Sequence, residues 1–248
     1  MLKKNKNQNQ ATIIFKGELN DFLKNKNSKI VCEFTDNHPI KDLVESIGPP
    51  HPEIALIYAD GKSVEFDFKV NNKSMFIIFP HQYNNEISEK KTLPSIPQGK
   101  PLFILDVHLG TLARYLRMAG FDTLYNNEDW GDEYIAERAG AENRIVLTRD
   151  IGLLKRSVVV YGRWLRNTDP KKQFSEVVKR FRLSNHFELT TRCTKCNNFL
   201  ISVPKEEIIE MLEEQTKKDY NEFWKCYGCN QIYWKGSHYD KIAKFLTQ

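Results

Sequence analysis

The chain has 248 residues, of which 40% are hydrophobic and 28% are charged, and its formal net charge is +5. This composition excludes an intrinsically disordered protein, and the length is sufficient for two or three folded domains. No apolar run approaches the roughly 20 residues of a membrane-spanning helix, and no signal-peptide core follows the first lysines. We therefore expect a cytoplasmic protein that does not associate with membranes.

The first part of the chain has the pattern of a small α+β domain over residues 11–80. The polar opening MLKKNKNQNQ is expected to be frayed. The elements predicted after it are strands at 11–17 and 28–34, a helix at 38–48, a hairpin at 53–66 and a strand at 74–80. Gly48 ends the helix, and Asp60-Gly61 forms the hairpin turn. This order is typical of a β-grasp fold.

A Pro- and Ser-rich stretch within residues 81–100 predicts a linker, and strands then alternate with helices over residues 101–184. The predicted strands are 101–107, 121–125, 144–148 and 157–162, and the predicted helices are 108–120 and 131–140. Such alternation predicts an α/β domain in which helices cover both faces of a parallel sheet. This part of the chain also holds the positive charge, with 15 Lys and Arg against 11 Asp and Glu over residues 100–184. The excess suits a nucleic-acid partner, although a solvated surface would give the same count.

Acidic residues follow the ends of the predicted strands. Asp106 follows the first strand and Asp150 the third, while Asp129 and Asp132 come from the loop and the first helical turn after the second. The carboxyl ends of parallel strands share one edge of the sheet, and carboxylates close together stay ionised most easily around a cation. Mg²⁺ and Mn²⁺ prefer oxygen ligands, so we expect Asp106, Asp132 and Asp150 to bind one of them. Asp132 could instead be an ordinary N-terminal helix charge, and Asp129 an ordinary loop acid.

Five basic residues near these acids are candidates for holding a phosphate backbone. They are Arg114, Arg117, Arg149, Lys155 and Arg156. Arg114 and Arg117 are three residues apart and would share one helix face. Each could equally be a solvated surface cation.

Four of the five cysteines form two CxxC pairs, Cys193 with Cys196 and Cys226 with Cys229. Two such pairs are typical of a Cys₄ zinc site, which is structural because four thiolates leave no open position for water. The intervening segment predicts one inserted helix at residues 204–218. A redox CxxC motif is the alternative. Residues 185–248 are thus expected to form a zinc ribbon, whose aromatic residues could stack on bases or cover the metal site.

The middle segment, with "FILDVHLGTLARYLRMAGFDTLY" and "LTRDIGLLKR", resembles the Mut7-C RNase domain, a branch of the PIN-like nucleases. The resemblance implies a PIN-like α/β/α fold and metal-dependent RNA hydrolysis. It makes Asp106 the first acid, Asp150 a later one and Asp132 the middle one, with Asp129 as the alternative.

The flanking segments resemble the domains that accompany this nuclease. Residues 11–80, through "FKGELNDFL" and "ALIYADGKSVEF", are similar to the Mut7-C ubiquitin-like domain and to sulfur carriers. Those carriers act through a terminal Gly-Gly, which does not follow Pro80 here, so we expect docking or packing, or a protein partner. Residues 185–248 resemble the closing zinc ribbon, through "RCTKC" and "YNEFWKCYGCNQIYW".

Two functions remain open at this point. The first is a ribonuclease that uses Mg²⁺ or Mn²⁺, carries structural Zn²⁺ and acts on RNA, with tRNA and rRNA both candidates. The second is a non-catalytic RNA- or ribosome-binding adaptor with a degenerate site. The adaptor is favoured by the lack of a convincing fourth acid, since Asp169 lies in a segment that reads as an exposed turn.

Overall fold

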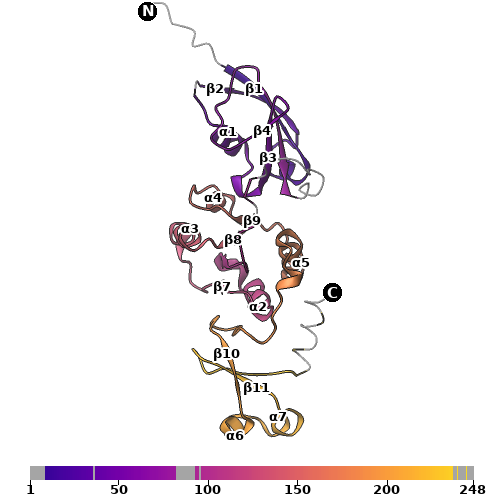
Figure 1. Ribbon diagram of the computed structural model, residues 1–248, viewed down its shortest axis with the longest axis vertical. Coiled ribbons are helices and arrows are strands. Elements are labelled where there is room, and N and C mark those ends of the chain that lie inside the picture. The colour runs from indigo at the N-terminus through magenta and orange to yellow at the C-terminus, as the bar shows by residue number, and fades with distance from the viewer. Residues whose placement is uncertain are drawn as a thin grey trace, which may run out of the picture.

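The protein is described by a computed structural model that covers residues 9–35, 37–81, 93–94, 96–236, 239 and 244. Figure 1 shows three bodies stacked along the long axis: a mixed sheet, a parallel sheet flanked by helices, and a small antiparallel sheet. This order confirms the predicted succession of a β-grasp domain, an α/β domain and a ribbon. The start of the chain predicted to fray, residues 1–8, and most of the predicted linker, residues 82–92 and 95, lie outside the described residues.

The N-terminal domain is a five-stranded sheet with the order β2-β1-β5-β3-β4, in which β1 and β5 run parallel. Its elements are β1 (Asn9–Phe15), the 3₁₀ segment η1 (Gly17–Phe22), β2 (Lys29–Phe34), α1 (Ile40–Ile47), the 3₁₀ segment η2 (His51–Glu53), β3 (Ile54–Ala59), β4 (Lys62–Val64) and β5 (Met75–Pro80). The helix ends at Gly48 and the hairpin turns at Asp60-Gly61, both as predicted; these two turn residues have φ of 48° and 86°. Leu93, within the predicted linker, packs into the core of this domain.

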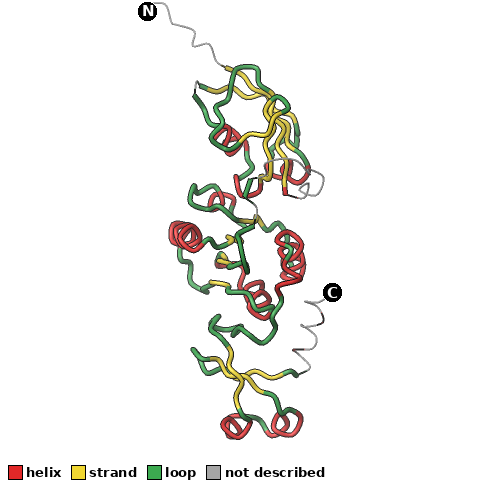
Figure 2. The backbone as a smooth tube through the Cα atoms, in the orientation of Figure 1, coloured by secondary structure: helices red, strands yellow, loops and turns green. Residues whose placement is uncertain are grey.

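The middle domain is a four-stranded parallel sheet with the order β7-β6-β8-β9. Its elements are β6 (Phe103–Leu105), α2 (Gly110–Met118), β7 (Thr123–Leu124), α3 (Gly131–Glu142), β8 (Ile145–Thr148), α4 (Ile151–Leu154), β9 (Gly162–Trp164) and α5 (Pro170–Phe181). Successive strand residues face opposite sides. Phe103 and Leu147 pack with α2 and α5, whereas Ile104 and Val146 pack with α3 and α4. The resulting α/β/α layers are visible in Figure 2.

Two features of this domain differ from the sequence prediction. The predicted strand at 157–162 is wrong, because Val158 and Val160 are exposed in a loop and the strand begins only at Gly162. A side chain at Gly162 would lie 2.5 Å from the Leu154 Cδ2 atom, so a glycine allows α4 to cross the strand closely. Helix α5 was not predicted, and Asp169 is its N-cap, with a carboxylate that accepts from the Lys171 amide at 2.9 Å.

The C-terminal domain is a three-stranded antiparallel sheet, β10 (Leu200–Val203), β11 (Phe223–Cys226) and β12 (Ile232–Trp234). The predicted single helix at 204–218 is wrong, since two short helices, α6 (Lys205–Ile208) and α7 (Glu214–Asp219), replace it. The break between them lets Ile208 and Leu212 pack together against the sheet residues Val203 and Phe223. No helix in the part of the chain that the structure describes is long and apolar enough to cross a bilayer.

The N-terminal domain docks on the middle domain through a buried ion network. Arg163 in β9 contacts Glu53 at 2.7 Å and Glu18 at 2.8 Å across the junction, and also Glu176 of α5 at 2.7 Å. Glu53 has no exposed surface and also accepts from the Trp164 amide at 2.7 Å. Although burial alone would raise it, the hydrogen bond and charge of Arg163 lower the pKa of Glu18. This network shows that the N-terminal domain packs within the chain, in agreement with the expectation of docking or packing.

Candidate functional site

Two of the predicted acids are held by the same threonine at the carboxyl edge of the parallel sheet. Asp106 directly follows β6, and its Oδ2 atom accepts from the Thr148 hydroxyl at 3.1 Å. The same hydroxyl oxygen accepts from the Asp150 amide at 2.8 Å, just after β8. Since Thr148 is fully buried at the end of a core strand, its position is fixed. Asp106 and Asp150 are therefore linked through one hydroxyl group although they are 44 positions apart in the sequence.

Each of these two acids also caps a helical segment. The Oδ1 atom of Asp106 accepts from the Val107 amide at 2.6 Å, and that of Asp150 accepts from the Gly152 amide at 2.7 Å. Amide donors stabilise the ionised carboxylates and orient them. For Asp106, both oxygens are engaged, one by an amide and one by the Thr148 hydroxyl. The carboxylates are thus positioned by the backbone before any cation is considered.

Asp132 and Asp129 come to the same edge from the start of α3. Partial burial and the negative charges of Asp150, Asp106 and Asp129 raise the pKa of Asp132, while the charge of Arg156 opposes this shift. The charges of the other three acids therefore reach Asp132, although among the described residues these four carboxylates do not gather as closely as the four cysteines do. The Asp129 carboxylate accepts from the Gly131 amide at 2.8 Å, which fixes the turn that leads into α3.

The shifted Asp132 pKa gives a prediction about stability without added Mg²⁺ or Mn²⁺. A folded-state pKa above the unfolded value contributes stability at low pH that is lost as the pH rises through the folded pKa. Asp132→Asn removes the titrating carboxyl group and with it this pH-dependent contribution to the free energy of unfolding. The stability of the variant relative to the wild type should therefore increase as the pH rises from the unfolded-state pKa to the folded-state pKa of Asp132. Urea unfolding of both proteins across the acidic range measures the difference. Glu133→Gln, one residue further along α3, is the charge-matched control, and an equal pH trend in both variants would contradict the raised pKa of Asp132.

The five predicted RNA-binding cations separate into two groups. Arg114 and Arg149 are exposed and line a cleft beside the acids, and Arg156 is exposed near Asp132. Lys155 instead donates to the Glu45 carbonyl at 2.5 Å and so takes part in the docking of the N-terminal domain. Arg117 also has a structural role, because only 4% of it is exposed.

Arg117 connects the middle domain to the cysteine-bearing segment. Its guanidinium donates to the carbonyls of Thr123 at 3.0 Å, Thr194 at 3.2 Å and Lys195 at 3.1 Å. The last two residues lie between the first pair of cysteines. Burial lowers the pKa of Arg117 although the nearby thiols oppose the shift. The prediction of RNA contact does not fit this geometry, because its donors are directed at backbone carbonyls inside the protein.

The four paired cysteines converge on one point. Their sulfur atoms all lie within 4.8 Å of one another, with 3.6 Å between Cys193 and Cys229 and 3.3 Å between Cys196 and Cys226. Thiolates about 2.3 Å from a tetrahedral zinc ion would lie about 3.8 Å apart. Among the described residues, no other group of three or more His, Cys, Asp or Glu side chains brings its potential ligand atoms this close together. The cluster fits a structural zinc ion.

The two CxxC turns have the same local structure. The amide of Cys196 donates to the Cys193 sulfur at 3.4 Å, and the amide of Cys229 donates to the Cys226 sulfur at the same distance. An asparagine in a left-handed conformation follows each pair. Burial raises the pKa of the Cys226 thiol, and four thiolates this close together would repel one another unless a cation lay among them. Matched turns and mutual repulsion favour metal binding over a redox motif.

Sequence reasoning found the acids and cysteines but did not assign a role to Thr148. The sequence feature that could have indicated this role is the position of Thr148 at the end of a buried strand, two residues before Asp150. A hydroxyl group buried there needs a hydrogen-bond partner. Trp164 was also missed. Its ring nitrogen donates to the Arg149 carbonyl at 3.1 Å, and its ring packs against Phe22 of the N-terminal domain in a tilted arrangement, with centroids 4.8 Å apart. The N-terminal domain therefore supports the loop that carries Asp150.

Comparison with known proteins gives two family matches. Residues 101–246 match the model described as Mut7-C RNAse domain, and residues 8–86 match the model described as Mut7-C ubiquitin. No curated protein and no solved structure matches the chain. The first match spans more than half of the chain and includes both the acidic edge and the four cysteines. The chain therefore belongs to the Mut7-C RNase domain family, and it carries a Mut7-C ubiquitin domain ahead of the RNase domain.

Proposed function

We propose that the protein is a ribonuclease that hydrolyses RNA phosphodiester bonds with Mg²⁺ or Mn²⁺ held by Asp106, Asp132 and Asp150. The observation that carries this proposal is the Thr148 hydroxyl, which hydrogen-bonds both the Asp106 carboxylate and the Asp150 amide and so brings two strand ends together. The charges of these acids also reach Asp132, whose pKa they raise. Asp129 contributes to that shift and is our candidate for the fourth acid. The family match to an RNase domain supports RNA as the substrate class.

The chain's own residues have distinct tasks in this proposal. A bound divalent ion would supply activation of water and stabilisation of the charge that develops at phosphorus. Thr148 orients the Asp106 carboxylate and holds the backbone amide of Asp150 through its two hydrogen bonds. Arg149, directly before Asp150, and Arg114 on α2 are the cations proposed to hold the phosphate groups. Pre-positioned acids avoid the cost of gathering charges when substrate arrives.

The zinc ribbon is proposed to bind Zn²⁺ through Cys193, Cys196, Cys226 and Cys229. Four thiolate ligands leave no open position, so this ion would have a structural role and would not take part in hydrolysis. The proposal therefore has two metal sites of different chemistry, sulfur ligands for zinc and oxygen ligands for the hydrolytic ion.

The proposed activity is tested with Asp106→Asn and Asp150→Asn. With single-stranded and structured RNAs in Mg²⁺ or Mn²⁺, we expect each variant to cleave on the order of 100-fold more slowly than the wild type, since each loses a charged ligand. Asp169→Asn is the matched control, because Asp169 is also an N-cap and asparagine keeps that role. It should cleave at the wild-type rate.

Two outcomes would contradict the proposal. Equal residual cleavage by all four proteins would show a contaminating nuclease. RNA binding by all four proteins without cleavage by any of them would favour the adaptor function, in which the acids hold no catalytic ion.

A further inference from the structure

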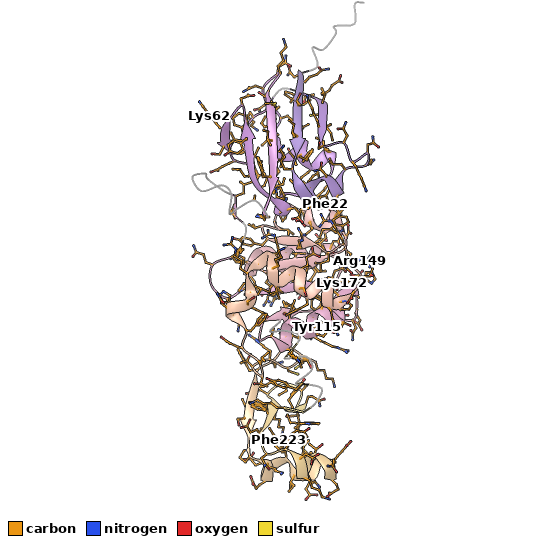
Figure 3. The ribbon with its side chains drawn as sticks, turned by 90° about the vertical axis from the view of Figure 1, so that its right-hand side faces the viewer. Phe22, Lys62, Tyr115, Arg149, Lys172 and Phe223 are labelled. Atoms are coloured by element: carbon orange, nitrogen blue, oxygen red, sulfur yellow. The ribbon has the colours of Figure 1, made fainter. Side chains whose placement is uncertain are left out.

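A large cleft lies between the middle domain and the zinc ribbon. Its volume is about 1380 Å³, and its walls come from the segment after Asp106, the start of α5, the first CxxC turn and strand β12. This volume exceeds the roughly 300–1,000 Å³ of ordinary small-molecule pockets. Val107, His108 and Arg149 line it, so it adjoins the acidic edge described above. Figure 3 labels Arg149 and Tyr115, two lining residues, on the middle domain.

The described charged residues that line this cleft are cations. Among its lining residues that the structure describes there is no Asp or Glu, although the acids of the candidate site lie close to one end. Arg114, Arg149 and Lys195 line it and are exposed, and none of them forms an ion pair with a described residue. Arg192 also lines it, but this residue is paired with Asp122 at 3.2 Å. Exposed cations without a carboxylate among them would attract a polyanion.

The ribbon side of the cleft adds aromatic surface. Trp234 is 37% exposed and packs beside Tyr220, with ring centroids 6.4 Å apart. Tyr233 also lines the cleft, but its hydroxyl contacts the Cys193 sulfur at 3.0 Å, which ties this wall to the cysteine cluster. Tyr115 of α2 faces the same space from the middle domain. Aromatic rings beside cations are the combination that single-stranded nucleic acid uses, because unpaired bases can stack on them.

We propose that this cleft binds single-stranded RNA, so that the zinc ribbon forms one wall of the substrate site. The proposal rests on the ribonuclease function proposed above and specifies the form of its substrate. Lys195 and Arg114 contact phosphates from opposite walls of the cleft, and Trp234 stacks on a base. Arg149 contacts the RNA phosphate that lies nearest to the acids. Single-stranded RNA is favoured over a duplex because stacking on Trp234 requires an unpaired base.

The test is RNA binding by the full-length, zinc-loaded protein without added Mg²⁺ or Mn²⁺. Fluorescence anisotropy is measured with a labelled single-stranded 12-mer and with a hairpin of the same composition. We expect tighter binding of the single strand. Lys195→Gln and Arg114→Gln should each reduce the slope of log affinity against log salt by about 1. Trp234→Ala should weaken binding on the order of ten-fold with little change in that slope.

Two variants outside the cleft are matched controls. Tyr227 is 79% exposed on the ribbon but does not line the cleft, and Lys62 lies in β4 of the N-terminal domain. Tyr227→Ala and Lys62→Gln should bind as the wild type does. If Trp234→Ala loses zinc, the proposal is judged on Lys195→Gln and Arg114→Gln alone.

The binding result is separable from the cleavage result. Loss of binding in the cleft variants supports the proposal even if the wild type cleaves no RNA, which would overturn only the nuclease function. Cleavage by the wild type with unchanged binding in all three cleft variants would overturn the proposal. Tighter binding of the hairpin than of the single strand would also overturn it.

Discussion

Removal of zinc, by chelation or by Cys226→Ser, is expected to unfold the C-terminal domain while the parallel sheet stays folded. The hydrophobic core of the ribbon is small, with five buried residues from Val203 to Ile232. Zinc binding to four thiolates can supply on the order of 10–16 kcal/mol to such a domain. Arg117 would lose its acceptors at Thr194 and Lys195, so the middle domain should also lose some stability.

Limited proteolysis with mass spectrometry, together with zinc content, measures this effect. The expected product is a resistant fragment that contains the first two domains and ends before Cys193. Cys32→Ser is the control, because Cys32 lies in β2 of the N-terminal domain, far in sequence from the cluster. A Cys226→Ser protein that resists proteases as the wild type does would show that the ribbon folds without its metal.

Arg163→Met is expected to destabilise the protein by about 3–5 kcal/mol, the usual cost of leaving a buried charge unpaired. Glu53 has no exposed surface, and Arg163 is the cation that contacts its carboxylate. The carboxylate also accepts from the uncharged Trp164 amide at 2.7 Å, and the buried charge of Arg180 nearby would compensate only part of the loss. The loss should appear as a lower midpoint of urea unfolding and as faster cleavage between the first two domains.

A second substitution distinguishes the destabilisation caused by the unpaired buried charge from the destabilisation caused by lost side-chain packing. Adding Glu53→Gln to Arg163→Met removes the unpaired carboxylate, so the double variant should be more stable than the sum of the two single losses predicts. Lys100→Met breaks the solvent-exposed pair with Glu188 and should cost far less, because water screens the attraction between exposed charges. Equal losses from Arg163→Met and Lys100→Met would contradict the importance of the junction network.

The acidic edge could be predicted from sequence because it follows from strand order alone. Asp106 and Asp150 each come directly after a short apolar run, and parallel strands place such positions together. Thr148 could not be assigned the same way, because its two hydrogen bonds depend on the register between β6 and β8. That register pairs Leu105 with Leu147 and so brings the following residues side by side.

The errors have a common physical origin in contacts between distant segments. Strand β9 was placed too early because Arg163 does not look like a buried strand residue, and its partners Glu18 and Glu53 precede it by more than 100 residues. Lys155 and Arg117 were predicted to bind phosphate because their charge can be read from the sequence. The backbone carbonyls that they contact cannot be identified without the tertiary structure. Local patterns thus predicted the elements, whereas the roles of buried cations depended on tertiary packing.

The absence of a recognised fourth acid in the sequence also has a structural explanation. Asp169 was considered and set aside, and the structure shows it as the cap of α5. Asp129, considered only as a substitute for Asp132, contributes to the raised pKa of Asp132. The argument for a degenerate site is therefore weaker once Asp129 is proposed to act together with Asp132.

The central claim is that the acidic edge binds a divalent ion, and crystals soaked in Mn²⁺ test it most directly. Anomalous scattering should give a manganese peak bounded by the carboxylates of Asp106, Asp132 and Asp150, and this peak should be lost in crystals of Asp106→Asn. The zinc peak expected at the four cysteines, recorded at its own absorption edge, is the internal control. A clear zinc peak with no manganese at the acidic edge would contradict the account.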